Sequence, residues 1–488
     1  MHDSHGQESQ RRGVLGWIAA HPKTSISLCL LLLLISVTVL FDRAAQGRVA
    51  RQIAALRAAG MPATLEDLQA AMPDVPDDQN MTIPILEQAR MLEAIKLTED
   101  HLRQLPYIGL VHSTPSGRRW PAEQIEAARW YLDQASDALP IIHEALKLER
   151  GRVDVQWKSP AFNIPLPEVF YIRHVAKVLA LESAVAAEDG NARRAAEILL
   201  DSCRLERSLD GEPFVITAMV RMAVHALACD RIERTINLCG LSDASLQRLQ
   251  TELRGQEGAD YYKQALFGER VIFIDTVRWL QSAPAGSMSG ITGGGGFSTS
   301  SGFPIPVDAV WKFLPILPRL DEAAGIRFYN DLIQAVEDPD AASIQRVKTA
   351  ESLITTLPIY CLVTRIMMPS FSRGTEVWVR SVGQNRALQA AIACERYRLA
   401  TGGWPEALDA LVPDYLAAVP VDPFDGKPMR YAQTDEGIKI WTISENLIDD
   451  GGDIGRLTVR RNSYRPKDAG WVLLNPDLRN RPAETEDK

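Results

Sequence analysis

Residues 387–453 read ALQAAIACERYRLATGGWPEALDALVPDYLAAVPVDPFDGKPMRYAQTDEGIKIWTISENLIDDGGD. This order predicts a helix, a Gly-Gly break, a second helix begun by Trp-Pro, a Pro-Asp-Pro turn, a hairpin and an acidic glycine loop. No catalytic constellation accompanies these elements. The stretch therefore predicts a small α+β unit at the C-terminal end, and it indicates how that end is built more than what chemistry it performs.

The first helix and the hairpin supply the apolar faces of this unit. Pro405 begins the second helix, PEALDALV, with Leu408 and Leu411 facing inward. MRYAQ and IKIWTI are joined by a loop at 434–437, and WVLL at 471–474 predicts a further strand. One face of the first helix is apolar and faces the same core: Leu388, Ala391, Ile392 and Leu399.

The unit resembles the globular head of the major pseudopilins of bacterial type II secretion. In that family a long helix ends in a glycine-x-tyrosine/tryptophan-proline pattern, similar to RLATGGWPEALDALVPDYL at 398–416. An aspartate-proline-aromatic turn with Gly-x-Pro-x-x-Tyr follows, similar to DPFDGKPMRY at 422–431. The resemblance implies a pseudopilin-like α+β module over residues 381–475.

The acidic loop at 444–453 is the one candidate ion site. Three aspartates around two glycines suit a hard cation such as calcium, which takes carboxylate and carbonyl oxygens in a curled loop. In the pseudopilin family this loop binds calcium, so the resemblance implies Asp449, Asp450 and Asp453 as the carboxylates, with Ser444 nearby. The pattern is not that of an EF-hand, and an exposed acidic turn without an ion is the default interpretation.

The chain departs from a pseudopilin in its organisation. A pseudopilin head directly follows the N-terminal membrane helix, whereas here a long segment separates Phe41 from Leu388. No prepilin-type processing site precedes the apolar run. As a whole, the chain is more similar to large membrane-anchored proteins of planctomycete-type bacteria that end in the same tail.

Residues 24–41, TSISLCLLLLLISVTVLF, carry no charge. As a helix this segment rises about 27 Å, close to the ~30 Å hydrocarbon core of a bilayer. It predicts a transmembrane helix after a tail at 1–23, with the lipid bilayer as partner. A cleaved signal peptide is the alternative, but Arg43 and Arg48 interrupt the candidate cleavage site. Basic residues flank both ends, so export of the large C-terminal part follows from the resemblance rather than from charge.

Residues 46–380 predict an α-helical domain of the helical-hairpin type. Antiparallel helices joined by short turns follow one another between 168 and 254, without self-similarity at the ~34-residue period of tetratricopeptide repeats. A flexible Gly/Ser-rich loop is predicted at 282–306 and a disordered tail at 476–488. The chain is therefore predicted to be mainly α, with an N-terminal membrane helix and a small α+β module.

Composition and motifs exclude several function classes. The chain has 53 basic and 62 acidic residues and a net charge of -9, which argues against nucleic acid as a partner. No P-loop, nucleophile elbow or HExxH motif occurs, and the 6 cysteines form no CxxC pair. His174 and His225 lie on predicted helices, where packing is the default role.

The sequence predicts a non-catalytic, membrane-anchored binding or scaffolding protein of the envelope, acting on a protein partner. One alternative is an enzyme with a site in the helical domain. Its candidate residues are Glu269 and Arg270, although an intrahelical charged pair is the default interpretation. Another alternative is a subunit of a secretion or pilus-like assembly.

Overall fold

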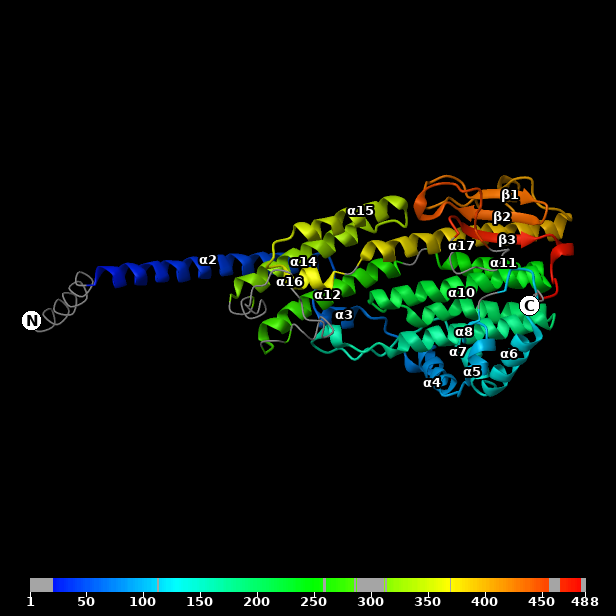
Figure 1. Cartoon of the computed structure of the whole chain (residues 1–488), viewed down its shortest axis with the longest axis horizontal. Coiled ribbons are helices and arrows are strands. Elements are labelled where there is room, and N and C mark those ends of the chain that lie inside the picture. The colour runs from blue at the N-terminus through cyan, green and yellow to red at the C-terminus, as the bar shows by residue number, and fades with distance from the viewer. Residues whose placement is uncertain are drawn as a thin grey trace, which may run out of the picture.

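The computed structural model describes residues 21–111, 114–257, 260–284, 287, 311, 314–368, 370–455 and 466–483. In these residues the chain is mainly helical with one small antiparallel sheet, as the sequence predicts. Figure 1 shows an elongated molecule in which the N-terminal helix projects from one end and the sheet lies at the other. Most of the predicted Gly/Ser-rich loop at 282–306 and most of the tail at 1–23 lie outside the described residues.

Helices form most of the described chain. They are α2 (Pro22–Ala58), α3 (Leu65–Ala71), α4 (Thr82–Glu93), α5 (Glu99–Gln104), α6 (Ala122–Gln134), α7 (Ala138–Ala145), α8 (Pro167–Glu188), α9 (Ala192–Arg204), α10 (Val215–Cys239), α11 (Asp243–Gly255), α12 (Tyr261–Ser282), α14 (Ile316–Ala335), α15 (Ala341–Ser352), α16 (Leu362–Met367) and α17 (Phe371–Thr401). Short 3-10 turns lie at Asp77–Gln79, Ala161–Asn163, Leu205–Leu209, Leu353–Thr356, Leu408–Leu411, Ser444–Asn446 and Pro476–Leu478.

Helix α2 is one continuous element, long and apolar enough to cross a membrane. Its apolar first half, including the predicted segment 24–41, is exposed, whereas Ala45, Val49 and Leu56 are buried. The buried residues follow a three-four spacing, which places them on one helix face. That face packs on α14, where Asp42 pairs with Arg319. The predicted membrane segment is therefore the first half of a helix whose second half belongs to the core.

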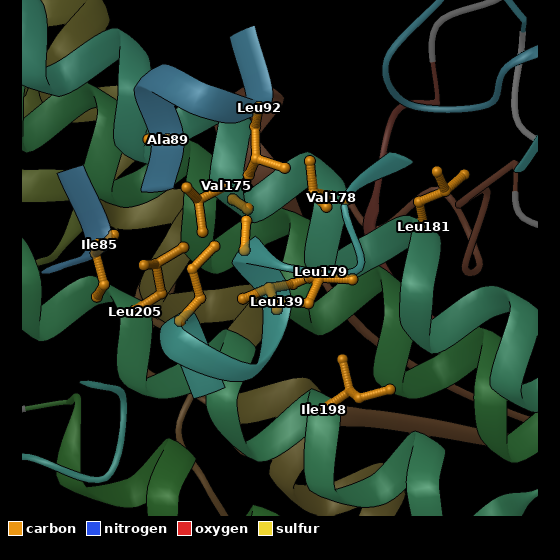
Figure 2. Packing of buried hydrophobic residues seen from close by; sticks show 14 of the residues in the cluster. Ile85, Ala89, Leu92, Leu139, Val175, Val178, Leu179, Leu181, Ile198 and Leu205 are labelled. Carbon is orange, nitrogen blue, oxygen red and sulfur yellow. The ribbon is translucent and has the colours of Figure 1, made fainter. Parts of the chain in front are cut away.

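Helix α8 is the centre of the first core, which Figure 2 shows from close by. Val175, Val178 and Leu179 of α8 have no exposed surface, and α4, α7, α9 and α10 surround them. Because α8 is apolar on nearly all sides, it suits a position enclosed by other helices. Fully burying each such side chain contributes about 1.5–3 kcal/mol.

A second core joins α2, α12, α14, α15 and the first half of α17. Gly325 permits the close approach of α14 to α12, since a Cβ there would lie 2.1 Å from the Phe273 ring. Phe273, Tyr329 and Phe371 form a series of tilted and edge-on ring contacts across these helices. This core ties the root of α2 to the start of α17.

The sheet has the order β1-β2-β3, with β1 at Arg430–Thr434, β2 at Gly437–Thr442 and β3 at Ala469–Leu474. Both pairs are antiparallel, which confirms the predicted hairpin and the predicted further strand. Thr434 pairs with Gly437, so two residues rather than four make the turn. A Cβ on Gly437 would lie 2.0 Å from the Leu473 carbonyl oxygen, and only glycine fits there.

The third core is shared by the helical part and the predicted module. Leu388, Ala391 and Ile392 of α17 are fully buried between α9–α11 on one side and the sheet on the other. Leu399, predicted on the same face, is 44% exposed. The predicted boundary at 380/381 falls inside α17, so residues 381–475 share their core with the bundle.

Two predicted elements differ in the structure. PEALDALV is not a helix but an irregular segment with one 3-10 turn, because Tyr431 and Gln433 donate hydrogen bonds to the Pro405 carbonyl oxygen that a helix would use internally. The first part of the tail predicted to be disordered, up to residue 483, is ordered, because Arg479 pairs with the buried carboxylate of Glu395 on α17. Residues 484–488 lie outside the described residues.

Asn237, near the end of α10, completes the outer edge of β3. Its amide nitrogen donates to the Val472 carbonyl oxygen at 2.7 Å and its amide oxygen accepts from the Leu474 N–H at 2.8 Å. An edge strand otherwise carries unpaired backbone groups. A fully buried side-chain amide thus takes the place of a fourth strand and attaches the sheet to the bundle.

The substitution Asn237→Ala is expected to lower the free energy of unfolding by about 2–4 kcal/mol, because two buried backbone groups of β3 lose their partners. The measurement is urea unfolding of the detergent-solubilised protein, followed by tryptophan fluorescence. Asn163→Ala, at an exposed position, is the matched control and should cost about 0.5 kcal/mol or less. Equal losses in the two variants would contradict the role given to Asn237.

Candidate functional site

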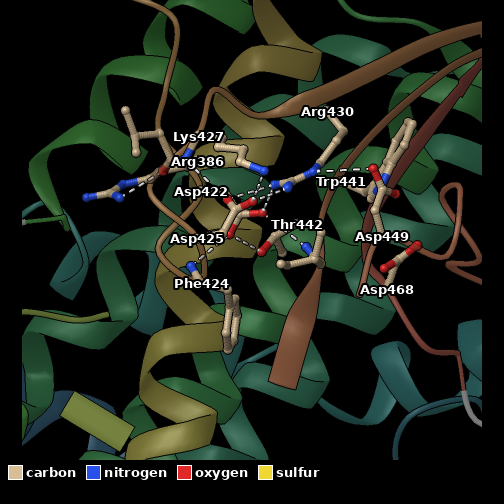
Figure 3. Close-up of polar contacts among 12 residues, drawn as sticks. Arg386, Asp422, Phe424, Asp425, Lys427, Arg430, Trp441, Thr442, Asp449 and Asp468 are labelled. Carbon is tan, nitrogen blue, oxygen red and sulfur yellow. Dashed lines mark hydrogen bonds and ion pairs between the residues drawn. The ribbon is translucent and has the colours of Figure 1, made fainter. Parts of the chain in front are cut away.

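The predicted aspartate-proline-aromatic turn is organised by a single buried carboxylate (Figure 3). Asp422 has no exposed surface. One of its oxygens accepts from the Phe424 N–H at 2.9 Å and the Thr442 hydroxyl at 2.7 Å. The other accepts from the Ile443 N–H at 3.0 Å and pairs with Arg430. These contacts close the turn onto the start of β1 and the end of β2.

Arg430 is shared among several carboxylates. It pairs with Asp422 and Asp425, and its Nε lies 3.6 Å from Asp449. Burial disfavours the charge, but the hydrogen bond to Asp425 and the three carboxylates together raise the pKa of Arg430. Burial likewise opposes the charge of Asp425, yet the hydrogen bonds from Arg430 and from the Lys427 N–H hold its pKa below the usual value. The cluster is a structural network in which one arginine is shared by three aspartates.

The acidic loop curls around a carboxylate that sequence reasoning missed. Asp468, which precedes β3 and is 3% exposed, accepts from the N–H groups of Gly452 at 2.9 Å and Asp453 at 3.2 Å. Gly451 and Gly452 have φ near +73°, which directs these N–H groups inward. The curled backbone therefore presents donors to an anionic side chain.

The three aspartates predicted to bind calcium contact protein groups. Asp449 accepts from the Trp441 indole N–H at 3.0 Å, and Asp450 accepts from Asn446 and Lys467. The backbone carbonyl of Asp453 accepts from the N–H of Asp468 at 3.2 Å. Ser444, predicted to lie nearby, donates to Glu445. In the part of the chain that the structure describes, no group of three or more His, Cys, Asp or Glu side chains is placed to hold a metal ion. Calcium binding stays a prediction.

Glu269 and Arg270, the candidate residues for an enzyme, have separate structural roles. Glu269 accepts from the Val215 N–H at the start of α10, and burial raises its pKa to about 6. Arg270 is fully buried and donates to Asn330 at 2.7 Å and to the Pro62 carbonyl oxygen at 3.0 Å. Burial lowers the pKa of Arg270 to about 10. The default interpretation as an intrahelical pair is wrong, because adjacent helix positions point in different directions.

Both histidines singled out in the sequence pack inside the bundle. His174 contacts the Tyr131 hydroxyl at 3.0 Å, and burial lowers the pKa of His174 to about 4. Residues Glu206, His225 and Cys229 form a hydrogen-bonded series, with 2.7 Å from Glu206 to His225 and 3.4 Å from His225 to the thiol. Burial opposes the charge on His225, yet Cys229 and Glu206 raise its pKa well above the usual value.

This series has the order of a nucleophile, a base and an orienting acid. However, Cys229 is 1% exposed and does not line the cavity that His225 and Glu206 reach. A molecule in that cavity would contact His225 and Glu206 but not the thiol. No local motif predicts this series, because its members come from two segments, with His225 and Cys229 one helix turn apart.

Comparisons of the chain with protein-family models, with curated proteins and with solved structures found no match. The described residues therefore define the protein by its architecture: a mainly α-helical chain that carries a small three-stranded antiparallel sheet. More particularly, it has one N-terminal helix long and apolar enough to span a membrane, and that helix continues into the core.

The substitution Asp422→Asn is expected to destabilise the fold by about 3 kcal/mol, because an amide NH2 in this fully buried site cannot accept from both the Ile443 N–H and Arg430 as the carboxylate oxygens do. Thermal and urea unfolding of the solubilised protein measure the loss. Asp425→Asn is the control at the same arginine, and its side chain is 19% exposed. Asp425→Asn should lower the free energy of unfolding by less than Asp422→Asn does. The reverse order would show that Asp422 does not organise the turn.

Titration with calcium, followed by calorimetry and by melting temperature, decides the ion prediction. The full chain in detergent is the sample, since residues 381–475 share their core with the bundle. If the loop binds calcium, saturable heat and a higher melting temperature are expected. Asp450→Asn should reduce both. If the unsubstituted protein gives neither signal, the loop is a hydrogen-bonded turn that does not bind calcium.

Proposed function

We propose that the protein is a single-pass membrane protein whose helical stack binds or scaffolds a protein partner at the cell envelope, without catalysis of its own. The observation that carries the proposal is the continuity of α2. Its first half exposes large apolar side chains, and its second half is built into the second core. A helix of this kind joins the lipid phase to the folded part without a hinge.

The exposed half of α2 supports an anchor over a cleaved leader. Leu34, Leu40 and Phe41 are each more than 60% exposed, and burying such side chains in lipid is strongly favourable. The residues directly after position 41 are packed: Asp42 pairs with Arg319, and Gln52 donates to the Ala323 carbonyl oxygen. Cleavage near position 45 would cut within this packed helix.

The arrangement suits display of the C-terminal module. In Figure 1 the sheet lies at the end of the molecule opposite to α2, with α17 running between them. A module held in this way projects away from the membrane surface. The likeness to pseudopilin heads remains part of the proposal, supported by a long helix that ends at Gly402 and carries an antiparallel sheet. The exported side is proposed on the same likeness.

The enzyme alternative is favoured by one observation, the Glu206–His225–Cys229 series beside a polar cavity. Because the thiol is enclosed, binding is the better supported use of that region. A role in a secretion or pilus-like assembly would require self-association of the part outside the membrane, which sedimentation of the solubilised protein measures.

A C-terminal fusion to alkaline phosphatase tests the topology, since that reporter forms its disulfides and folds only on the exported side. We expect high phosphatase activity. A fusion to green fluorescent protein at the same position should show no fluorescence. Removing residues 1–41 is the control and should abolish the activity. An active cytoplasmic reporter would remove the envelope part of the proposal. Full-length protein that dissolves without detergent would remove the anchor.

A further inference from the structure

A polar cavity of about 200 Å³ lies where several parts of the helical stack meet. Its walls come from residues around the end of α11 and the start of α12, the α14–α15 connection, the middle of α17, and Glu206 and His225. These segments are far apart in the sequence, and only the fold brings them together.

Two residues that line this cavity have an amide oxygen without a protein partner. Asn385, which is 3% exposed, donates its amide N–H to the Leu253 carbonyl oxygen at 3.0 Å, and its own amide oxygen has no partner. Gln256 donates to the Cys203 carbonyl oxygen at 2.8 Å, and its amide oxygen likewise has none. Each residue therefore places an unsatisfied, buried acceptor in the wall of the cavity. A buried acceptor without a donor is costly, so this wall favours a ligand with N–H groups.

The remaining polar lining is acidic. Glu257, Asp260, Glu337 and Asp338 line the cavity, while Glu206 and His225 are paired with each other. Among the described residues, no lysine or arginine lines it. Carboxylates on a concave surface with low-dielectric walls concentrate a negative potential. The cavity thus attracts a cation and repels an anion.

One wall is aromatic. Trp378, 5% exposed, lines the cavity and stacks on Tyr262 with ring centroids 5.3 Å apart. Tyr261 also lines it and already carries the Arg221 guanidinium at 4.7 Å from its ring centroid. Aromatic faces attract organic cations, and the tryptophan face is the strongest of them.

We propose that this cavity binds a small organic cation that carries N–H donors, namely a free alkylamine or alkylguanidine. The carboxylates supply hydrogen bonds and charge, and Trp378 covers the alkyl part. A metal ion fits less well, because no three His, Cys, Asp or Glu side chains converge within the described chain. The volume is below the ~300 Å³ of sites for drug-sized ligands, which selects a short chain.

Calorimetry of the full chain in detergent with 1,4-diaminobutane tests the site. Saturable binding that weakens with added salt is expected. The neutral isostere 1,4-butanediol keeps the length and removes the charge and the N–H donors, so it should not bind. Equal binding of the diol, or no binding of the diamine and of agmatine, would overturn the proposal.

Two pairs of substitutions distinguish binding in the cavity from attraction by the overall charge of the chain. Glu337→Gln with Asp338→Asn, both at exposed positions, should weaken diamine binding about five- to tenfold while the melting temperature stays unchanged. Glu123→Gln with Glu126→Gln on α6 removes the same charge elsewhere and should leave binding unchanged. Equal weakening by both pairs would show non-specific attraction and overturn the site. The result does not depend on membrane topology, so it is independent of the proposed anchor function.

Discussion

The structure depends on the burial of one long helix, α17, in two cores at once. Its first half, with Phe371 and Trp378, packs with α12, α14 and α15, and its second half, with Leu388 and Ile392, packs between the bundle and the sheet. A helix shared in this way cannot leave one core without opening the other. The N-terminal helix, the bundle and the sheet are therefore expected to behave as one mechanical unit.

Buried carboxylates in this fold hold loops and the end of the chain in place. Glu395, 1% exposed, holds Arg398 and Arg479, and so fixes the end of the chain on α17. Asp422 does the same for the turn before β1, and Asp468 for the acidic loop. Each carboxylate is surrounded by donors, which offsets the cost of burying its charge.

The cavity beside α17 differs from these clusters in one physical respect: its acceptors exceed its donors. Asn385 and Gln256 place unsatisfied amide oxygens in its wall, and no lysine or arginine is among its described lining residues. A surplus of acceptors next to an aromatic wall favours a cationic ligand with N–H donors.

The sequence alone determined the elements that depend on interactions between residues close together in the chain. The uncharged run at 24–41 predicts a membrane-spanning helix by length alone, and the alternating strands around Gly437 predict the hairpin through period and turn chemistry. Pairings between distant segments were decided only by the tertiary structure: the second half of α2 on α14, Asn237 on the edge of β3, and Asp468 inside the acidic loop. The segment after Pro405 forms no α-helix, because side chains of β1 donate hydrogen bonds to the Pro405 carbonyl oxygen. Helix period, turn residues and apolar length are properties of neighbours in the chain, whereas a buried polar group is satisfied by whatever the fold brings beside it.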